Sequence, residues 1–507
     1  MNASGTSRAR RLFSGWSANF FQMILGITQQ VALVPVFLHF WSSDVLAAWL
    51  AVYSAGNLVL IADAGLQLRA INRFLAFKSC VDSDGRTSQF YAAMMRVYFG
   101  LVGVLVAVLV VVALFFPPSA VLGFHGTAHF DVAFLVMTVG ILLTLPANLV
   151  TGLYRARGFY GRAVKLQSWG MLVAQVAQLI AIAATGSMLA VAIAYVATQL
   201  AVSAYFLMID APRLFPFLRG ARVRQSWSWV IGQFRIAVSF GVSGATELAL
   251  VNLPVLLVSA FVSDRVAVAQ WGLTRVVAGL LRVLCTQATL PLAAELGHDY
   301  AVGLKEQLRS LYARGSVLVT LLASLAVSGL LPFWPDFFAL WTHGTIPYDP
   351  LLTVTLLIGT TAAAPSILAL GYANYSNRRE LLVRTKGLQL VVFVLLSVLL
   401  IPSMGPFGAA LAIVSSDLLI QFGLLAVTII RHTLQHPWRH IAFLAAIIVA
   451  VILSGWALGT AIRLTIPGIG VVRFLTECLL WLVIVVLMAS PLANKGIRSR
   501  LTAAIPR

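Results

Sequence analysis

The sequence predicts an all-α integral membrane protein with about fourteen transmembrane helices. Of its 507 residues, 60% are hydrophobic and only 10% are charged, whereas soluble domains carry about 25% charged residues. Such a chain cannot cover its surface with water-facing side chains. The net charge of +19 comes from basic residues between the apolar stretches, a pattern typical of membrane topology rather than of nucleic-acid binding.

Fourteen apolar segments alternate with short polar loops, and a spanning helix needs about 20 such residues. One of them, Gly387–Ile401, is short for a span. The expected segments are Leu12–Phe40, Val45–Leu68, Phe90–Phe116, Val132–Tyr154, Val164–Thr185, Met188–Met208, Val230–Phe261, Val266–Ala294, Gly315–Leu331, Leu351–Tyr375, Gly387–Ile401, Phe407–Ile430, Ile441–Ile462 and Val471–Ala489.

The positions of the basic residues predict the orientation. When loops are numbered alternately, all but five of the 35 Lys and Arg residues fall on the side that holds both termini. Lys386 is counted there, in a loop, while Arg275 and Arg282 fall within a span. Because Lys and Arg remain on the cytoplasmic side of short loops, both termini are expected to be cytoplasmic.

The chain contains an internal repeat. Pro35-Val-Phe-Leu resembles Pro254-Val-Leu-Leu, and Pro146 matches Pro365, both at an offset of 219 (254 − 35 = 219; 365 − 146 = 219). Six helices per repeat place both copies in the same orientation, which predicts two bundles related by a pseudo-two-fold axis along the membrane normal. The expected domains are a six-helix lobe at 1–211, a cytoplasmic linker at 212–229, a second six-helix lobe at 230–432, and an additional helix pair with a cytoplasmic tail at 433–507.

The motifs of several enzyme classes are absent from the sequence. It has no G-x-x-x-x-G-K loop for ATP and no H-E-x-x-H, and its three cysteines form no CxxC pair. The longest expected outer loop, Pro332 to Pro350, is too short for a catalytic domain. These features favour a transporter over an enzyme, without catalytic residues, metal or organic cofactor.

Two intramembrane arginines are candidates for binding an anion. Arg275 and Arg282 are seven residues apart, which places them on one helix face about 10 Å apart. Guanidinium donors match phosphate oxygens, and a charge in hydrocarbon usually faces a cavity or a partner. Two other interpretations remain: structural pairing with an acid such as Glu247, and extension of each side chain to the membrane surface.

Three intramembrane acids, Glu247, Asp63 and Asp417, are candidates for coupling transport to an ion gradient. A buried carboxylate can exchange a proton, and one beside hydroxyls could hold a cation. For Glu247, a fixed ion pair with Arg275 or Arg282 is the competing interpretation.

Polar residues at helical spacing form stripes on several spans. Amides and hydroxyls in such stripes either join helices through hydrogen bonds or line a hydrated lumen that accepts sugars. The candidates for lining a cavity are Asn19, Gln22, Gln29, Tyr53, Asn57, Asn148, Arg155, Ser243 and Thr286.

Three segments resemble a known family. Gly15-Trp-Ser-Ala-Asn19, the run Leu46–Tyr53 and the run Asp63–Asn72 are similar to those of the O-antigen flippases. These are the polysaccharide transporter branch of the multidrug/oligosaccharidyl-lipid/polysaccharide exporter superfamily. The additional pair Ile441–Ala489 departs from the twelve helices of many such flippases and resembles the fourteen-helix lipid II flippases.

The resemblance implies a flippase in the bacterial inner membrane. Its substrate would be an undecaprenyl-diphosphate-linked oligosaccharide, moved from the cytoplasmic to the outer leaflet by alternating access for lipopolysaccharide or other surface polysaccharide synthesis. Arg275 and Arg282 would hold the diphosphate. A proton or sodium ion would be the coupling ion, and membrane lipids, a polysaccharide polymerase and chain-length proteins would be the partners.

Two other functions remain open from the residues. One is a multidrug or cation exporter of the same superfamily, in which cavity acids would outweigh cavity arginines. The other is a membrane-embedded polymerase or ligase of surface polysaccharide, which would form product from lipid-linked sugar.

Overall fold

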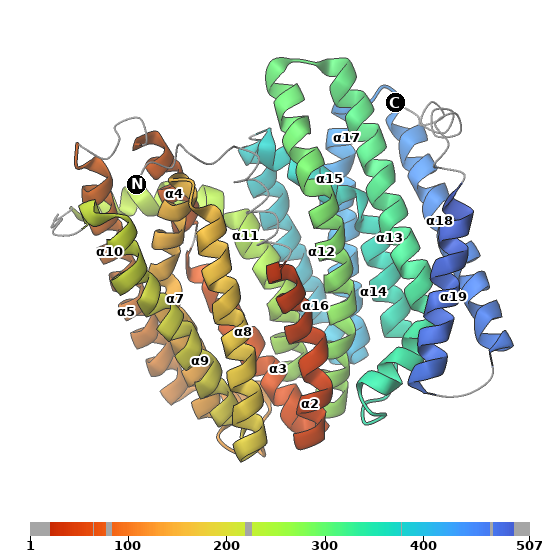
Figure 1. Ribbon diagram of the computed structural model, residues 1–507, viewed down its shortest axis with the longest axis horizontal. Coiled ribbons are helices and arrows are strands. Elements are labelled where there is room, and N and C mark those ends of the chain that lie inside the picture. The colour runs from red at the N-terminus through yellow and green to blue at the C-terminus, as the bar shows by residue number, and fades with distance from the viewer. Residues whose placement is uncertain are drawn as a thin grey trace. The chain divides into compact units, whose positions relative to one another are not determined.

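The computed structural model describes residues 21–63, 65–77, 84–218, 226–376, 378–466 and 470–490. These residues form helices joined by short connections, and no strand occurs among them. The all-α membrane fold predicted from the sequence is therefore confirmed (Figure 1). Asn19, a predicted cavity residue, lies outside the described residues.

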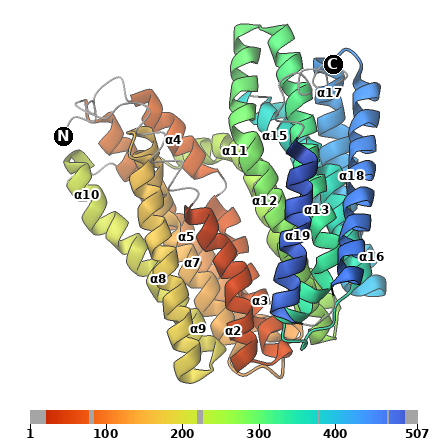
Figure 2. The same ribbon diagram turned by 45° about the vertical axis from the view of Figure 1, so that its right-hand side comes forward.

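Helix packing divides the chain into two units, Met1–Arg265 and Val266–Arg507. In the first unit, α7 is central and packs against α3, α4, α5, α8 and α9 (Figure 2). Its α-helices are α2 (Leu33–Phe40), which continues a span from Phe21, α3 (Ser43–Leu58), α4 (Leu66–Phe77), α5 (Arg86–Phe115), α6 (Pro118–Leu122), α7 (Phe130–Ala156), α8 (Tyr160–Thr185), α9 (Met188–Ala204), α10 (Ala211–Leu214) and α11 (Trp227–Phe261). Two π-helical segments, η2 (Thr28–Ala32) and η5 (Tyr205–Asp210), and two 3-10 helices, η3 (Val59–Asp63) and η6 (Pro216–Leu218), complete the unit.

In the second unit, α13 is central and packs against α14, α15, α18 and α19. The turn between α12 and α13 projects beyond the other helices of this unit, at the end where α17 terminates (Figure 1). The helices are α12 (Arg265–Val302), α13 (Lys305–Trp341), α14 (Pro350–Ala363), α15 (Pro365–Tyr375), α16 (Arg379–Ser416), the wide π-helical segment η7 (Asp417–Ala426), α17 (Val427–Thr433), α18 (Pro437–Thr465) and α19 (Val471–Ala489).

The number of spans is close to the prediction. Twelve helices of the described residues are long and apolar enough to cross a membrane, and α14 with α15, bent by 45°, makes a thirteenth if the pair is one span. The helical stretch Arg379–Thr433 has 55 residues, or about 80 Å at 1.5 Å per residue, far more than one crossing of about 30 Å requires. It reverses at Gly405 (φ 57°, ψ −137°), so it holds two antiparallel limbs, which would make fourteen spans.

The helix boundaries repeat at the offset found in the sequence. α5 begins at Arg86 and α13 at Lys305 (305 − 86 = 219), and α8 and α16 begin equally far apart. Gly186, which ends α8 with φ 62°, corresponds to Gly405 (405 − 186 = 219). Both reversals need a left-handed backbone, which glycine adopts without a steric penalty. The duplication therefore extends to the hairpin turns.

Three boundaries differ from the sequence expectations. α11 packs against α3 and α4 and so belongs to the first unit by contact, although the repeat assigns 230–261 to the second lobe. The expected outer loop from Pro332 is mostly helix, because α13 continues to Trp341 and leaves only 342–349 as a connection. The span expected to begin at Gly387 begins at Arg379, so its limb is long enough to cross.

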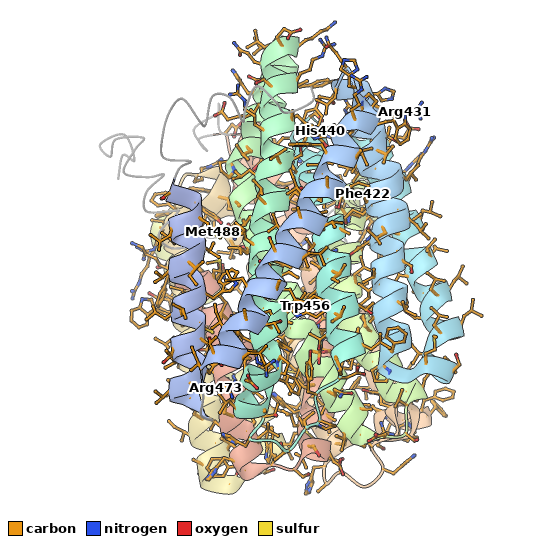
Figure 3. The ribbon with its side chains drawn as sticks, turned by 90° about the vertical axis from the view of Figure 1, so that its right-hand side faces the viewer. Phe422, Arg431, His440, Trp456, Arg473 and Met488 are labelled. Atoms are coloured by element: carbon orange, nitrogen blue, oxygen red, sulfur yellow. The ribbon has the colours of Figure 1, made fainter. Side chains whose placement is uncertain are left out.

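The additional helix α18 packs tightly against α13 through two glycines one turn apart. A Cβ on Gly455 would lie 2.5 Å from Ser328 Cβ, and one on Gly459 would overlap Pro332 Cγ. Small residues at i and i+4 let two helices approach closely in lipid. α19 then packs beside α18, and Figure 3 shows Trp456 of α18 and Met488 of α19 on the two neighbouring helices.

We expect Gly459→Val to destabilise the protein, because the new side chain overlaps Pro332. Overpacking of this kind costs about 1–3 kcal/mol, so the thermal unfolding midpoint of the purified protein should fall. Gly103→Val is the matched control, since Gly103 is also inside a helix but has nothing within 4 Å of its Cβ position. Equal midpoints for the two variants would contradict the close approach of α18 to α13.

Candidate functional site

The second unit contains an ion pair between two predicted site residues. Arg282 of α12 donates from Nη2 to Oδ2 of Asp417, the first residue of η7. The carboxylate side chain is 5% exposed and the arginine side chain 21% exposed. Removing one member of a buried pair costs about 3–5 kcal/mol, so each residue needs the other. Arg282 thus has an acidic structural partner, as one interpretation held, and that acid is Asp417.

The pair continues into a chain of buried polar side chains. Gln389 donates to Asp417 Oδ1 at 2.6 Å, and Lys386 donates to Gln389 Oε1 at 2.9 Å. Lys386 also donates to Gln421, which in turn donates to Ser366 at 2.8 Å. Lys386 is 1% exposed and Gln389 is 0% exposed. We refer to Arg282, Lys386, Gln389, Asp417 and Gln421 as the polar cluster of the second unit.

The Gly405 reversal explains how this cluster forms. The segments before and after Gly405 are antiparallel. A residue a given distance before the turn therefore faces a residue about the same distance after it. Gln389 meets Asp417, and Lys386, about one helical turn further from Gly405, meets Gln421, one turn further on the other limb. Lys386 was expected in a cytoplasmic loop. This expectation is wrong, because α16 begins at Arg379 and carries Lys386 inside the unit.

The other residues on the predicted arginine face differ in exposure. Arg275 is half-buried, and Trp271, one turn before it, is fully buried. Thr286 is exposed and its hydroxyl donates to the Arg282 carbonyl at 2.8 Å, which leaves its oxygen as an acceptor. On this face Trp271 is therefore packed inside the unit, whereas Thr286 is accessible.

In the first unit, Asp63 lies at the centre of a second polar cluster. Tyr98 of α5 donates to Asp63 Oδ1 at 2.5 Å, and the backbone N–H of Gln67 donates to Oδ2 at 3.2 Å. The Gln67 side chain donates to Thr151 Oγ1 at 2.8 Å and to the Asn148 carbonyl at 3.1 Å. Three helices, α4, α5 and α7, therefore meet at this cluster.

The backbone around Asp63 is irregular. The span ends in the tight turn η3, and α4 restarts after Gly65, which has φ 79°. A Cβ on Gly65 would overlap the Ala237 carbonyl oxygen of α11, so only glycine fits. Broken helices at membrane depth occur where the backbone is buried in protein or lines a cavity. Asp63 can therefore act as a cap for α4, as an ion-coupling carboxylate, or as both.

The remaining stripe residues mostly contact neighbouring helices. Gln29 is buried and donates to Gln178 Oε1 at 3.3 Å, which is the helix-joining arrangement. Tyr53 packs on Tyr195 with ring centroids 5.8 Å apart, and the Asn57 amide donates to the Tyr53 carbonyl at 3.0 Å.

Other predicted residues are more accessible. Arg155 is exposed and lies over the ring of Tyr160 at 5.2 Å. The side chains of Gln22, Asn148, Ser243 and Glu247 are half-buried. Glu247 and Ser243 lie on α11, which by contact is a helix of the first unit.

Sequence reasoning missed several members of these clusters. Lys386 and Gln389 lie at the start of an apolar run, where polar residues are easily interpreted as loop. Tyr98 has an amphipathic side chain that gives no polar signal of its own. Gln175 and Gln178 of α8, which bond to the span of Gln29 and belong to neither cluster, did carry a usable signal, because two amides three residues apart lie in the otherwise apolar second half of the helix.

The two clusters offer different chemistry. The cluster of the second unit presents cationic donors suited to an anion, and the Asp63 cluster presents a carboxylate suited to a proton or a cation. Among the described residues, no group of three or more His, Cys, Asp and Glu could hold a metal ion.

Comparisons with known proteins connect this architecture to transporters. No protein-family model matches the chain, and no curated protein matches it in sequence. Among solved structures, it is similar to the lipid II flippase MurJ in an inward closed conformation, with a TM-score of 0.69 at 12% identity over 95% of this chain and 99% of that chain.

Two MATE transporters are also similar in structure. A MATE family transporter of the MOP superfamily, inward-facing, gives a TM-score of 0.60 at 13% identity over 84% of this chain and 99% of that chain. The Vibrio cholerae MATE transporter VcmN, in a mutant form, gives a TM-score of 0.57 at 15% identity over 84% of this chain and 97% of that chain. At these identities the likeness concerns the fold, and the chain has the fold of the MOP superfamily transporters.

Proposed function

We propose that the protein flips a polyprenyl-diphosphate-linked oligosaccharide, such as an O-antigen or other surface polysaccharide repeat unit, from the cytoplasmic to the outer leaflet. It would do so by alternating access of its two units. A diphosphate is too polar to cross hydrocarbon unaided, while a long prenyl chain is too apolar to leave it. The transporter must therefore offer fixed cationic donors within the membrane.

The observation that carries this proposal is the charge of the polar cluster. Arg282 and Lys386 give the cluster two cationic side chains against its single carboxylate, Asp417, and Arg275 lies seven residues before Arg282 on the same helix. A drug exporter for cations would need the opposite balance. A fixed guanidinium fork also matches the geometry of phosphate oxygens better than an ammonium does.

Two of the three candidate coupling residues, Asp63 and Glu247, belong to the first unit. Asp63 is held by Tyr98 and by the start of α4, so a change in its protonation would alter the contact between α4 and α5. We propose a proton or a sodium ion as the coupling ion, with Glu247 on the neighbouring α11 as the second candidate.

A pair of charge-removing variants tests the role of Arg282. Arg282→Gln alone should lower stability, because Asp417 then remains buried without its partner. The double variant Arg282→Gln/Asp417→Asn removes both charges and should recover most of that loss. If Arg282 binds the diphosphate, the double variant should still lose flipping by at least about tenfold, measured as saccharide exposed on the outer leaflet of proteoliposomes.

The control is Asp417→Asn alone, which retains Arg282 and should flip better than the double variant. Recovery of flipping together with stability in the double variant would mean that the pair is only structural.

The leaflet in which substrate accumulates tests the function itself. In cells lacking the protein, we expect the undecaprenyl-diphosphate saccharide to accumulate on the cytoplasmic leaflet and surface polysaccharide to be lost. Membrane-impermeant oxidation of the sugars in spheroplasts and in inverted vesicles distinguishes the two leaflets. Accumulation of unpolymerised units on the outer leaflet would instead indicate a polymerase or ligase.

Export of lipophilic cations is the second candidate, and the Asp63 cluster is the observation that favours it. A half-buried carboxylate beside a tyrosine could bind an organic cation directly. We expect the purified protein to show no saturable binding of tetraphenylphosphonium. Binding that is lost in Asp63→Asn would transfer the proposal to an exporter.

Asp63→Asn also separates capping from coupling. Asn caps a helix about as well as Asp, and its side-chain oxygen can still accept a hydrogen bond from Tyr98 or Gln67, so the unfolding midpoint should change little. Ion-driven flipping should fall strongly if the carboxylate carries the coupling charge. Unchanged flipping, at an unchanged midpoint, would leave Asp63 with a structural role alone.

A further inference from the structure

A polar cavity of about 270 Å³ lies in the second unit, beside the turn that joins α12 and α13. Its wall combines that turn with the ends of α15 and α17. The lining residues are Asp299, Tyr300, Gly303, Lys305, Leu308, Arg309, Tyr372, His432 and Thr433. Asp299 lies 17 residues beyond Arg282 on α12, or about 25 Å along the helix, so this cavity is separate from the polar cluster.

The basic side chains of the cavity favour an anion. Lys305 and Arg309 come from the first turns of α13, and His432 comes from the last turn of α17. Lys305 and His432 make no side-chain hydrogen bond or ion pair with the described residues. Arg309 is anchored by a hydrogen bond to the Thr433 carbonyl and by Glu306.

The backbone at the start of α13 adds to this preference. The N-cap residue, Leu304, provides no side-chain acceptor for the first N–H groups of α13. The Lys305 N–H already donates to the Gly303 carbonyl, and the positive end of the dipole of this long helix favours a nearby anion.

A buried acid in the same wall narrows the choice of ligand. Asp299 is 9% exposed, and its carboxylate forms no hydrogen bond or ion pair with a side chain among the described residues. A buried carboxylate needs a donor. A simple anion would leave it unsatisfied, whereas a ligand with a phosphate and a neighbouring ammonium or hydroxyl group satisfies both ends of the cavity.

At the position equivalent to Arg309, the first unit has a buried aromatic ring, so the repeated fold itself does not require the cavity. The repeat aligns Arg309 with Phe90 (309 − 90 = 219). Phe90 is buried and packs against Phe74, Phe77 and Trp229, with ring centroids 5.6, 6.0 and 6.1 Å away. The same corner of the scaffold is therefore filled with aromatic rings in one unit and lined with charge in the other.

We propose that this cavity binds a phosphate ester that also carries an ammonium or hydroxyl donor. Lys305, Arg309 and His432 hold the phosphate, and Asp299 accepts from the donor. The head group of phosphatidylethanolamine has this chemistry, as does soluble phosphoethanolamine. The exposed Val302 and Leu304 on the adjoining turn favour a lipid as the source. A bound ligand would join the α12–α13 turn to the ends of α15 and α17, independently of the transported substrate.

The test is ligand-dependent stabilisation of the full-length protein, since a ligand that binds only the folded state raises the unfolding midpoint. In detergent, phosphoethanolamine should raise the midpoint in a saturable manner. In nanodiscs, phosphatidylethanolamine should raise it relative to phosphatidylcholine alone. Stabilisation in either arm supports the site, and the arm in which it occurs identifies the lipid or the soluble compound as the source.

Variants connect the effect to the cavity. Lys305→Ala should weaken phosphoethanolamine binding about tenfold, since one charge-assisted contact is lost. Asp299→Asn should weaken phosphoethanolamine but not inorganic phosphate. The control Arg384→Ala removes an exposed charge that pairs with the exposed Glu380 and should bind as the wild type does. Absence of stabilisation in both arms, or equal binding by wild type and Lys305→Ala, would overturn the proposal.

Discussion

A charged group surrounded by hydrocarbon must find its partner within the protein, and in the second unit this requirement falls on Arg282. Its pair with Asp417 joins α12 to η7. Gln389 and Lys386 then extend the contact to the first limb of α16. The pair forms only if the hairpin reverses at Gly405, because a shift of one residue in the turn would rotate Asp417 away from its partners. Burial of charge thus fixes how α12, the first limb of α16 and η7 are aligned along one another.

The duplicated scaffold places opposite charges at one equivalent position. Asp63 and Arg282 correspond by the repeat offset (282 − 63 = 219). Asp63 lies where a helix is broken and accepts a hydrogen bond from a tyrosine, whereas Arg282 lies within the continuous helix α12 and pairs with a carboxylate. After duplication, the residue at this position could change in either unit only if the side chains that contact it changed as well. The asymmetry is therefore a property of whole clusters and fits a division between cation handling and anion handling.

The sequence revealed the spans, the repeat and most charged members of these clusters, because each depends on local composition or on offset alone. Pairing could not be predicted, since the contact of Arg282 with Asp417 bridges 135 residues. Lys386 could not be placed correctly, because a lysine that precedes an apolar run has the same pattern in a loop as in a buried turn of helix. The prolines Pro402 and Pro406 on either side of Gly405 did mark the reversal.

Structural and binding roles are compatible in Arg282. A guanidinium group has five N–H donors, and one N–H of Arg282 Nη2 donates to Asp417. The side chain remains 21% exposed, whereas Asp417 is almost fully enclosed. An incoming phosphate could therefore reach the arginine without displacing the carboxylate. The ion pair would hold the fork in place before substrate arrives, which reduces the entropy lost on binding.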